Sequence, residues 1–147
     1  MRRTVLIVVG LVVVAGVGLL LARYLTTESR ERNAIKRLLE AQVQGDAPAM
    51  LDALDGSCAR DARCRATVEE NARKLQRAGE PKIIGYSSDT AYALGGATGA
   101  TRVAWTVLDE GLPVVQCVEV RRGGSAVAGR TVTLLRISAP IGNEASC

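Results

Sequence analysis

The chain begins with a continuous apolar segment. Residues 5–22, with the sequence VLIVVGLVVVAGVGLLLA, contain 18 positions without a charge. As an α-helix this segment is about 27 Å long, close to the hydrocarbon thickness of a bilayer. Arg2 and Arg3 precede the segment and Arg23 follows it, as is typical of the two interfaces of a membrane. The pattern predicts an N-terminal membrane anchor over residues 1–25 that forms one transmembrane helix.

A cleaved signal peptide is the alternative interpretation of this segment. Such peptides have a shorter apolar region, followed by small residues at the cleavage site. Here the apolar run is long and ends in the sequence LLLAR, without an Ala-x-Ala pattern. We therefore favour an uncleaved signal-anchor that crosses the membrane once.

The charges that flank the anchor leave its orientation open. Arg2 and Arg3 favour a cytoplasmic N-terminus, because positively charged flanks stay on the cytoplasmic side. The basic residues after the anchor favour the opposite orientation: Arg23, Arg30, Arg32, Lys36 and Arg37. Four cysteines in the rest of the chain favour an oxidising compartment. On that ground we expect the N-terminus in the cytoplasm and the C-terminal domain outside the cell membrane.

After the anchor, the spacing of apolar residues predicts helices. Residues 26–34 are polar, and we expect them to form a juxtamembrane linker and the start of a first helix capped by Ser29. Apolar positions then recur at helical spacing: Ile35, Leu38, Leu39 and Val43. Asp46 is placed to cap a second helix that ends at Gly56. A third helix is predicted over residues 59–78.

From residue 82 onward the pattern changes to the alternation of β-strands. Five strand segments are predicted, at residues 82–88, 91–94, 101–108, 113–122 and 131–138. Residues 95–99 are expected to form a loop, with turns at 109–111 and 122–125. The apolar positions of the last segment change phase midway, which indicates a β-bulge.

Helices followed by strands predict an α+β fold. We expect about three helices packed on one face of a curved antiparallel sheet of four to five strands. The extracytoplasmic α+β domain would then comprise residues 35–147, which is enough chain to bury one core.

The composition excludes several kinds of chemistry. The 147 residues carry a net charge of +4 and contain no His, so a Ser-His-Asp or Cys-His mechanism within the chain is excluded. Without Arg2 and Arg3, 17 basic and 15 acidic residues remain, a difference of 17 − 15 = +2. So small a charge, with only 3% aromatic residues for base stacking, does not indicate nucleic-acid binding. We expect no nucleic-acid partner and no cofactor.

Four cysteines follow the anchor: Cys58, Cys64, Cys117 and Cys147. An even number in a small exported domain favours disulfides. Among the three possible connectivities we favour Cys58–Cys64 together with Cys117–Cys147. Four buried free thiols are the alternative. A metal site is disfavoured, because the spacing includes no C-x-x-C and there is no His to complete a mixed ligand set.

The predicted third helix carries a set of basic residues. Five of them form a candidate docking strip for acidic partners or lipid head groups: Arg60, Arg63, Arg73, Lys74 and Arg77. The alternative interpretation is a solvated face whose cations pair with Glu69 and Glu70 one turn away. We favour the solvated face, because charge runs on helices are usually of that kind.

No set of residues indicates catalysis. Asp52 and Asp55 lie one turn apart on a predicted helix, and the turn at 109–111 carries two more carboxylates, but neither pair has a partner for acid–base work. Residues 95–99 are rich in Gly but lack the Gly-Lys-Ser/Thr ending of a phosphate-binding loop. Trp105 is expected in the core, because Trp is usually largely buried.

Part of the chain resembles a known superfamily. The apolar positions of IKRLL at residues 35–39 are followed by GDAPAML at residues 45–51. This pattern and the order of elements resemble the nuclear-transport-factor-like superfamily, with its cone-shaped α+β fold, over residues 29–138. The chain looks like a membrane-anchored extracytoplasmic bacterial variant. Enzymes of the superfamily often pair a pocket Asp with a His or Tyr, but this chain has no His, and helix capping explains Asp46.

These observations favour a non-enzymatic function. The anchor, the expected disulfides and the lack of a catalytic set predict an accessory binding or scaffold module of the cell envelope. Its partner would be another protein or a second copy of the chain. A small-molecule or lipid binder that uses the concave face of the sheet is the alternative. A divergent enzyme that uses Asp, Glu or Tyr is the least favoured.

Overall fold

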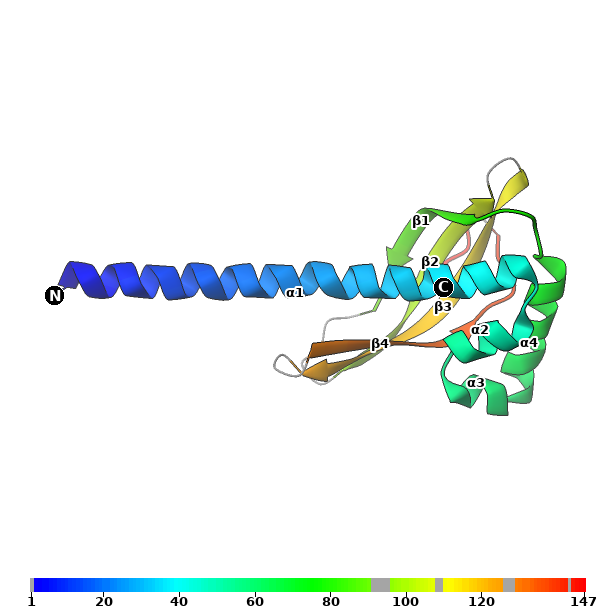
Figure 1. Cartoon of the computed structure of the whole chain (residues 1–147), viewed down its shortest axis with the longest axis horizontal. Helices are drawn as coiled ribbons and strands as arrows, with labels where there is room; N and C mark the ends of the chain where they lie inside the picture. The colour runs from blue at the N-terminus through cyan, green and yellow to red at the C-terminus, as the bar shows by residue number, and fades with distance from the viewer. Residues whose placement is uncertain (1, 91–95, 108–109, 126–128, 143) are drawn as a thin grey trace.

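In the part of the chain that the structure describes, four helices combine with one antiparallel sheet (Figure 1). It is a computed structural model that describes residues 2–90, 96–107, 110–125, 129–142 and 144–147. Side chains are described for all of these except residues 2–6, 19–26, 110, 125, 129 and 130. The α+β class predicted from the order of helices and strands is confirmed.

The first helix, α1 (Arg2–Gln44), is continuous from the apolar segment into the domain. Its N-terminal half projects beyond the domain, and its C-terminal half lies against the sheet (Figure 1). The prediction of a separate helix that begins near Ser29 is therefore wrong, and residues 26–34 are helical. The physical reason is that residues 19–44 contain no Gly or Pro, so nothing interrupts the helix between the two predicted parts.

Helix α2 (Ala47–Ala53) begins as predicted. The Asp46 carboxylate accepts a hydrogen bond from the backbone N–H of Ala49 at 2.9 Å, which confirms Asp46 as the N-cap. The end predicted at Gly56 is wrong, because α2 ends at Ala53 and Gly56 begins the next helix, α3 (Gly56–Arg60).

The single helix predicted over residues 59–78 is also wrong in its continuity. The helical structure is interrupted at Asp61, between α3 and α4 (Ala62–Lys74). Asp61 has extended backbone angles, and its side chain accepts hydrogen bonds from the N–H groups of Arg63 and Cys64. A capping carboxylate of this kind starts a new helix.

The sheet contains four strands in the order β1-β2-β3-β4, each antiparallel to its neighbour. The strands are β1 (Pro81–Ser88), β2 (Ala97–Val107), β3 (Glu110–Ser125) and β4 (Gly129–Ile137). The strand segment predicted at residues 91–94 lies outside the described residues, and so do residue 108 of a predicted strand and residue 109 of the turn predicted at 109–111. Residues 110–111 of that turn belong to β3. The turn predicted over residues 122–125 is wrong.

Those four residues continue β3 and pair with β4. Gly123 lies opposite Thr131, and Ser125 lies opposite Gly129. The bulge predicted in the last strand is confirmed, because the register shifts at Glu119 and Val120 and leaves Leu135 as the extra residue of β4.

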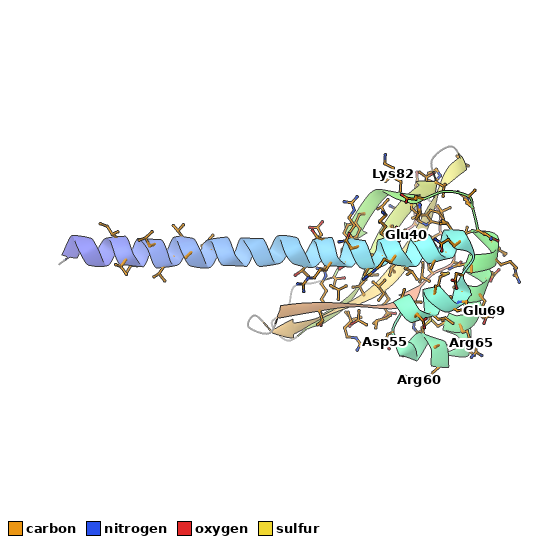
Figure 2. The ribbon with its side chains drawn as sticks, viewed as in Figure 1. Glu40, Asp55, Arg60, Arg65, Glu69 and Lys82 are labelled. Atoms are coloured by element: carbon orange, nitrogen blue, oxygen red, sulfur yellow. A yellow bond between two sulfur atoms is a disulfide. The ribbon has the colours of Figure 1, made fainter. Side chains whose placement is uncertain are left out.

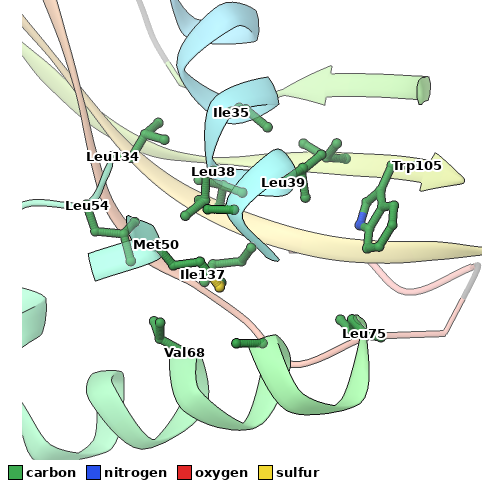
Figure 3. Close-up of a cluster of buried hydrophobic side chains, with 14 of the residues drawn as sticks. Ile35, Leu38, Leu39, Met50, Leu54, Val68, Leu75, Trp105, Leu134 and Ile137 are labelled. Atoms are coloured by element: carbon green, nitrogen blue, oxygen red, sulfur yellow. The ribbon is translucent and has the colours of Figure 1, made fainter. Parts of the chain in front are cut away.

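The core lies between the sheet, the C-terminal half of α1 and the shorter helices (Figure 3). Trp105 is fully buried, as predicted. The strand alternation places Val103, Val118 and Val120 on the same buried face. Large buried apolar side chains of the helices pack against this face, among them Ile35, Leu38, Leu39, Met50 and Val68.

Candidate functional site

A buried ion pair joins α1 to the sheet. Glu31 of α1 is fully buried, and it shares one side of the helix with Ile35 and Leu38, one and two turns later. Arg122 of β3 is also buried, because the alternation that turns Val118 and Val120 inward continues to it. The Nε and Nη2 atoms of Arg122 each lie 2.7 Å from Oε2 of Glu31.

The second carboxylate oxygen of Glu31 is held by two other strands. The hydroxyls of Tyr86 in β1 and Thr101 in β2 each donate a hydrogen bond of 2.6 Å to Oε1. Burial, and then the hydrogen bond to Glu31, raise the pKa of the Tyr86 hydroxyl, so this hydroxyl remains protonated and continues to donate. One carboxylate of α1 is thus bound to three of the four strands.

The guanidinium of Arg122 has further partners at the end of β1. Its Nη1 donates to the backbone oxygen of Thr90 at 3.2 Å, and its Nη2 donates to the hydroxyl of Ser88 at 3.0 Å. Among the described residues, every buried side-chain nitrogen and oxygen has a hydrogen-bond partner. A buried charge with all its partners in place fixes a geometry, and removing either charge would leave the other unpaired.

A second polar cluster lies farther along α1. The Gln116 carbonyl accepts hydrogen bonds from Gln42 at 3.0 Å and from the indole N–H of Trp105 at 2.9 Å. The Gln116 amide donates to the backbone oxygen of Ser138, which also accepts from Asn71 of α4. Two points along α1 are therefore hydrogen-bonded to the sheet through buried side chains, and the helix is fixed in register and rotation.

The opposite face of α1 is exposed and basic. Arg32, Lys36 and Arg37 are exposed on it, and Lys36 lies 3.4 Å from the carboxylate of Glu40. Two surface grooves flank this face, and both are lined in part by Asn33 and Lys36.

The first groove has a volume of about 480 Å³ and lies between α1 and the start of β1, where Lys82 and Glu80 line it. The second has a volume of about 600 Å³ and lies between α1 and β4, where Thr131 and Val132 line it. Among their charged residues, Arg30, Arg32, Lys36, Arg37 and Lys82 outnumber Glu40 and Glu80. The face is therefore suited to an anionic partner.

The candidate docking strip lies elsewhere in the domain. Arg60 is on α3 and Arg63, Arg73 and Lys74 are on the exposed side of α4, while the guanidinium of Arg77 lies 5.7 Å from the centre of the Trp105 ring. Acidic residues interrupt the strip, because Glu70 pairs with Lys74 and Glu69 with Arg65.

Figures 1 and 2 show α3 and α4 at the end of the domain farther from the N-terminus of α1. The predicted strip and the basic face of α1 are thus separate surfaces.

The structure contains the two disulfides that we favoured. Cys58–Cys64 connects α3 to α4 across the break at Asp61. Cys117–Cys147 connects β3 to the end of the chain. The segment before Cys147 runs back along β3, where the N–H of Ile141 donates to the oxygen of Val115 at 2.8 Å. Disulfides of this kind are typical of an oxidising compartment.

Of the two carboxylate pairs in the sequence, the structure describes Asp52 and Asp55, and Asp55 serves as a helix cap. Asp52 is exposed on α2, whereas Asp55 caps α3 through the N–H of Ser57, and this hydrogen bond holds the pKa of its carboxyl below the ordinary value. Asp109 lies outside the described residues. Within the described part of the chain, no cluster of His, Cys, Asp and Glu is arranged to hold a metal ion.

The N-terminal half of α1 exposes large apolar side chains. Ile7, Leu11 and Val14 are 62%, 66% and 70% exposed. When the described residues are considered alone, none of the helices meets the length and hydropathy of a membrane span.

Comparisons with family models, with curated proteins and with solved structures gave no match. The structure agrees with the coarse part of the superfamily resemblance, namely helices packed on a four-stranded antiparallel sheet.

The buried Glu31–Arg122 pair escaped the sequence analysis. Glu31 lies in a charged stretch that we interpret as a linker and the start of a helix, and Arg122 is predicted both to end a strand and to begin a turn. Two signals were present in the sequence: Glu31 precedes Ile35 by one helical turn, and Arg122 follows Val118 and Val120 in the inward phase of a strand. Two opposite charges on predicted buried faces can be read as a candidate pair.

Proposed function

We propose that this protein is a single-pass membrane-anchored domain, located outside the cytoplasm, that serves as an accessory docking or scaffold module of the cell envelope. One observation carries the proposal: α1 is a single helix whose residues 7–18 are apolar and exposed and whose second half is part of the domain core. An exposed apolar surface on this scale requires a nonpolar environment, because water solvates it poorly.

The proposed membrane anchor is the whole apolar segment at residues 5–22. The structure describes the side chains of residues 7–18 within it. The two disulfides support a location outside the cytoplasm. The buried contacts of Glu31 and Gln42 support a stiff connection between anchor and domain, since they fix α1 on the sheet. A stiff connection suits a module that presents a surface at a set distance from the membrane.

The inner face of the sheet does not favour the alternative of a ligand-binding cavity there. Val103, Trp105 and Val118 of that face are fully buried, and α1 covers them. We therefore place the docking function on the outer surfaces. Membership of the nuclear-transport-factor-like superfamily remains a prediction.

Extraction of membranes at alkaline pH tests the anchor. We expect the full chain to remain with the lipid fraction, and a variant that lacks residues 2–25 to be released. Release of the full chain would contradict the proposal. The shortened variant is a matched control, because its charged and core residues from Thr27 onward are unchanged.

Chemical crosslinking in membranes tests the docking role. The chain has three lysines, Lys36, Lys82 and Lys74, and all three are exposed. A lysine-reactive crosslinker should join Lys74 to a partner or a second copy if the α4 surface docks. A product at Lys36 or Lys82 would indicate the α1 surface instead. Recovery of monomer alone, at crosslinker levels that capture a known membrane complex, would count against a scaffold.

A further inference from the structure

We propose that the basic face of α1, defined by Arg32, Asn33, Lys36 and Arg37, binds the phosphate head groups of anionic lipids in the membrane that holds the anchor. This inference rests on the anchoring part of the proposed function and names one partner class for an exposed surface. It does not depend on which side of the membrane the domain occupies.

The position of this face along α1 brings it close to the bilayer. Arg32 follows the end of the apolar run at Ala22 by 10 residues, a rise of about 15 Å, and Arg37 follows it by 15 residues, a rise of about 22 Å. The polar head groups extend roughly 5–7 Å beyond the hydrocarbon. Arg32 therefore starts about 8–10 Å above the head groups, near the Debye length at physiological salt.

Side-chain direction shortens this distance further. In an α-helix every Cα–Cβ bond is tilted toward the helix N-terminus, which here is the membrane end. Long Arg and Lys side chains of α1 thus lean toward the bilayer, and their flexible stems bring the charged ends closer to its surface. A helix tilt of about 20°, which is average for membrane helices, would lower one side of the face and bring Lys36 or Arg37 nearer the lipid.

The charges around the face complement a phosphate. Five basic residues and two acidic residues line the two grooves, and Glu40 is already paired with Lys36. The side-chain amide of Asn33, which is common to both grooves, adds a hydrogen-bond donor. The strip on α4 has similar charges but lies at the far end of the domain (Figure 2), so it serves as an internal control.

The test uses the full chain in nanodiscs that contain equal amounts of phosphatidylglycerol and phosphatidylcholine. Native mass spectrometry of the released protein counts the two lipids that remain bound. We expect phosphatidylglycerol to be retained in preference. In Arg32→Gln/Arg37→Gln that preference should fall by at least about fivefold, since one basic residue near an anionic surface contributes about that factor.

Two control variants separate the effect of the charges on α1 from the effects of net charge and of altered folding. Arg63→Gln/Arg73→Gln removes the same charge from α4 and should keep the wild-type preference. Arg32→Lys/Arg37→Lys keeps the charge on α1 and should keep the preference as well. An equal loss in the α1 and α4 glutamine variants would overturn the proposal, because the effect would then be one of net charge.

The experiments test the head-group site and the membrane anchor separately. A wild-type chain that stays in alkaline-extracted membranes but shows no preference for phosphatidylglycerol would overturn the head-group site and leave the anchor intact. If such a chain bound a poly-glutamate peptide through Arg32 and Arg37, the α1 face would instead be a site for acidic protein segments.

Discussion

At the scale of single residues, the buried Glu31 is the central feature of the domain. A carboxylate without solvent exposure is costly unless charges and hydrogen bonds surround it, and Glu31 has Arg122, Tyr86 and Thr101 as partners. These partners lie on three strands, each of them distant from Glu31 in the sequence. The sequence marks Glu31 and Arg122 as buried charges, but it does not show that Tyr86 and Thr101 meet them, because local periodicity does not show which strand lies beside which helix.

Glu31→Gln should destabilise the domain by about 3–5 kcal/mol, because Arg122 would remain buried without its anion. Chemical denaturation of the full chain in detergent measures the difference. Glu40→Gln is the matched control on the same helix, since Glu40 is partly exposed and its pair with Lys36 should contribute less than about 1 kcal/mol. A loss below about 1 kcal/mol in Glu31→Gln would contradict the role given to the pair.

Asp61 predicts a dependence of stability on pH. Hydrogen bonds from the backbone N–H groups of Cys64 and Arg63 hold its carboxyl pKa below the ordinary value of 3.8, with a smaller contribution from Arg136. A depressed pKa means that the charged form stabilises the fold above pH 3.8. This contribution is lost as the pH falls from 3.8 through the folded-state pKa.

Asp61→Asn keeps a good capping residue but removes the ionisation. We expect wild type to be the more stable of the two near pH 6 and the difference to shrink as the pH falls below 3.8. Urea unfolding at a series of pH values measures this difference. A gap that stays constant down to pH 2 would show that the Asp61 charge contributes nothing.

At the scale of elements, the alternation and the capping residues predicted most of the secondary structure. Asp46 and the phase change in β4 were interpreted correctly because both are local signals. Several predicted boundaries were wrong, and three of them have physical reasons that compete with local signals. Residues 19–44 contain no Gly or Pro, so α1 continues through the polar residues after the anchor. Asp61 interrupts a helix as a cap, and Gly123 and Gly124 remain in β3 because they pair with β4.

The two disulfides should contribute unequally to stability. The Cys117–Cys147 link closes a separation of 30 residues and the Cys58–Cys64 link one of 6. On chain entropy alone, the longer link contributes about 3–4 kcal/mol and the shorter about 2 kcal/mol.

Cys117→Ser/Cys147→Ser should therefore lower the free energy of unfolding more than Cys58→Ser/Cys64→Ser, as measured by urea unfolding. The reverse order would show that the break between α3 and α4 depends on its disulfide more than chain entropy implies.

At the scale of the whole molecule, α1 is both the apolar segment and the helix that covers the sheet (Figure 1). The apolar run and the cysteines predicted the components of this arrangement. The basic face of α1 and the grooves beside it were not predicted, because they depend on how β1 and β4 flank the helix. The charged strip predicted on α4 proved to be a separate surface, interrupted by Glu69 and Glu70.

Thiol labelling in intact cells tests the central claim most directly. A membrane-impermeant thiol reagent should label the four cysteines only after treatment with an impermeant reductant, because the domain would be outside the cytoplasm with both disulfides formed. Labelling before reduction would contradict the disulfides. If the chain resists labelling even after that reduction, yet is labelled once the cells are lysed and the protein is denatured, the domain is in the cytoplasm and the account is wrong.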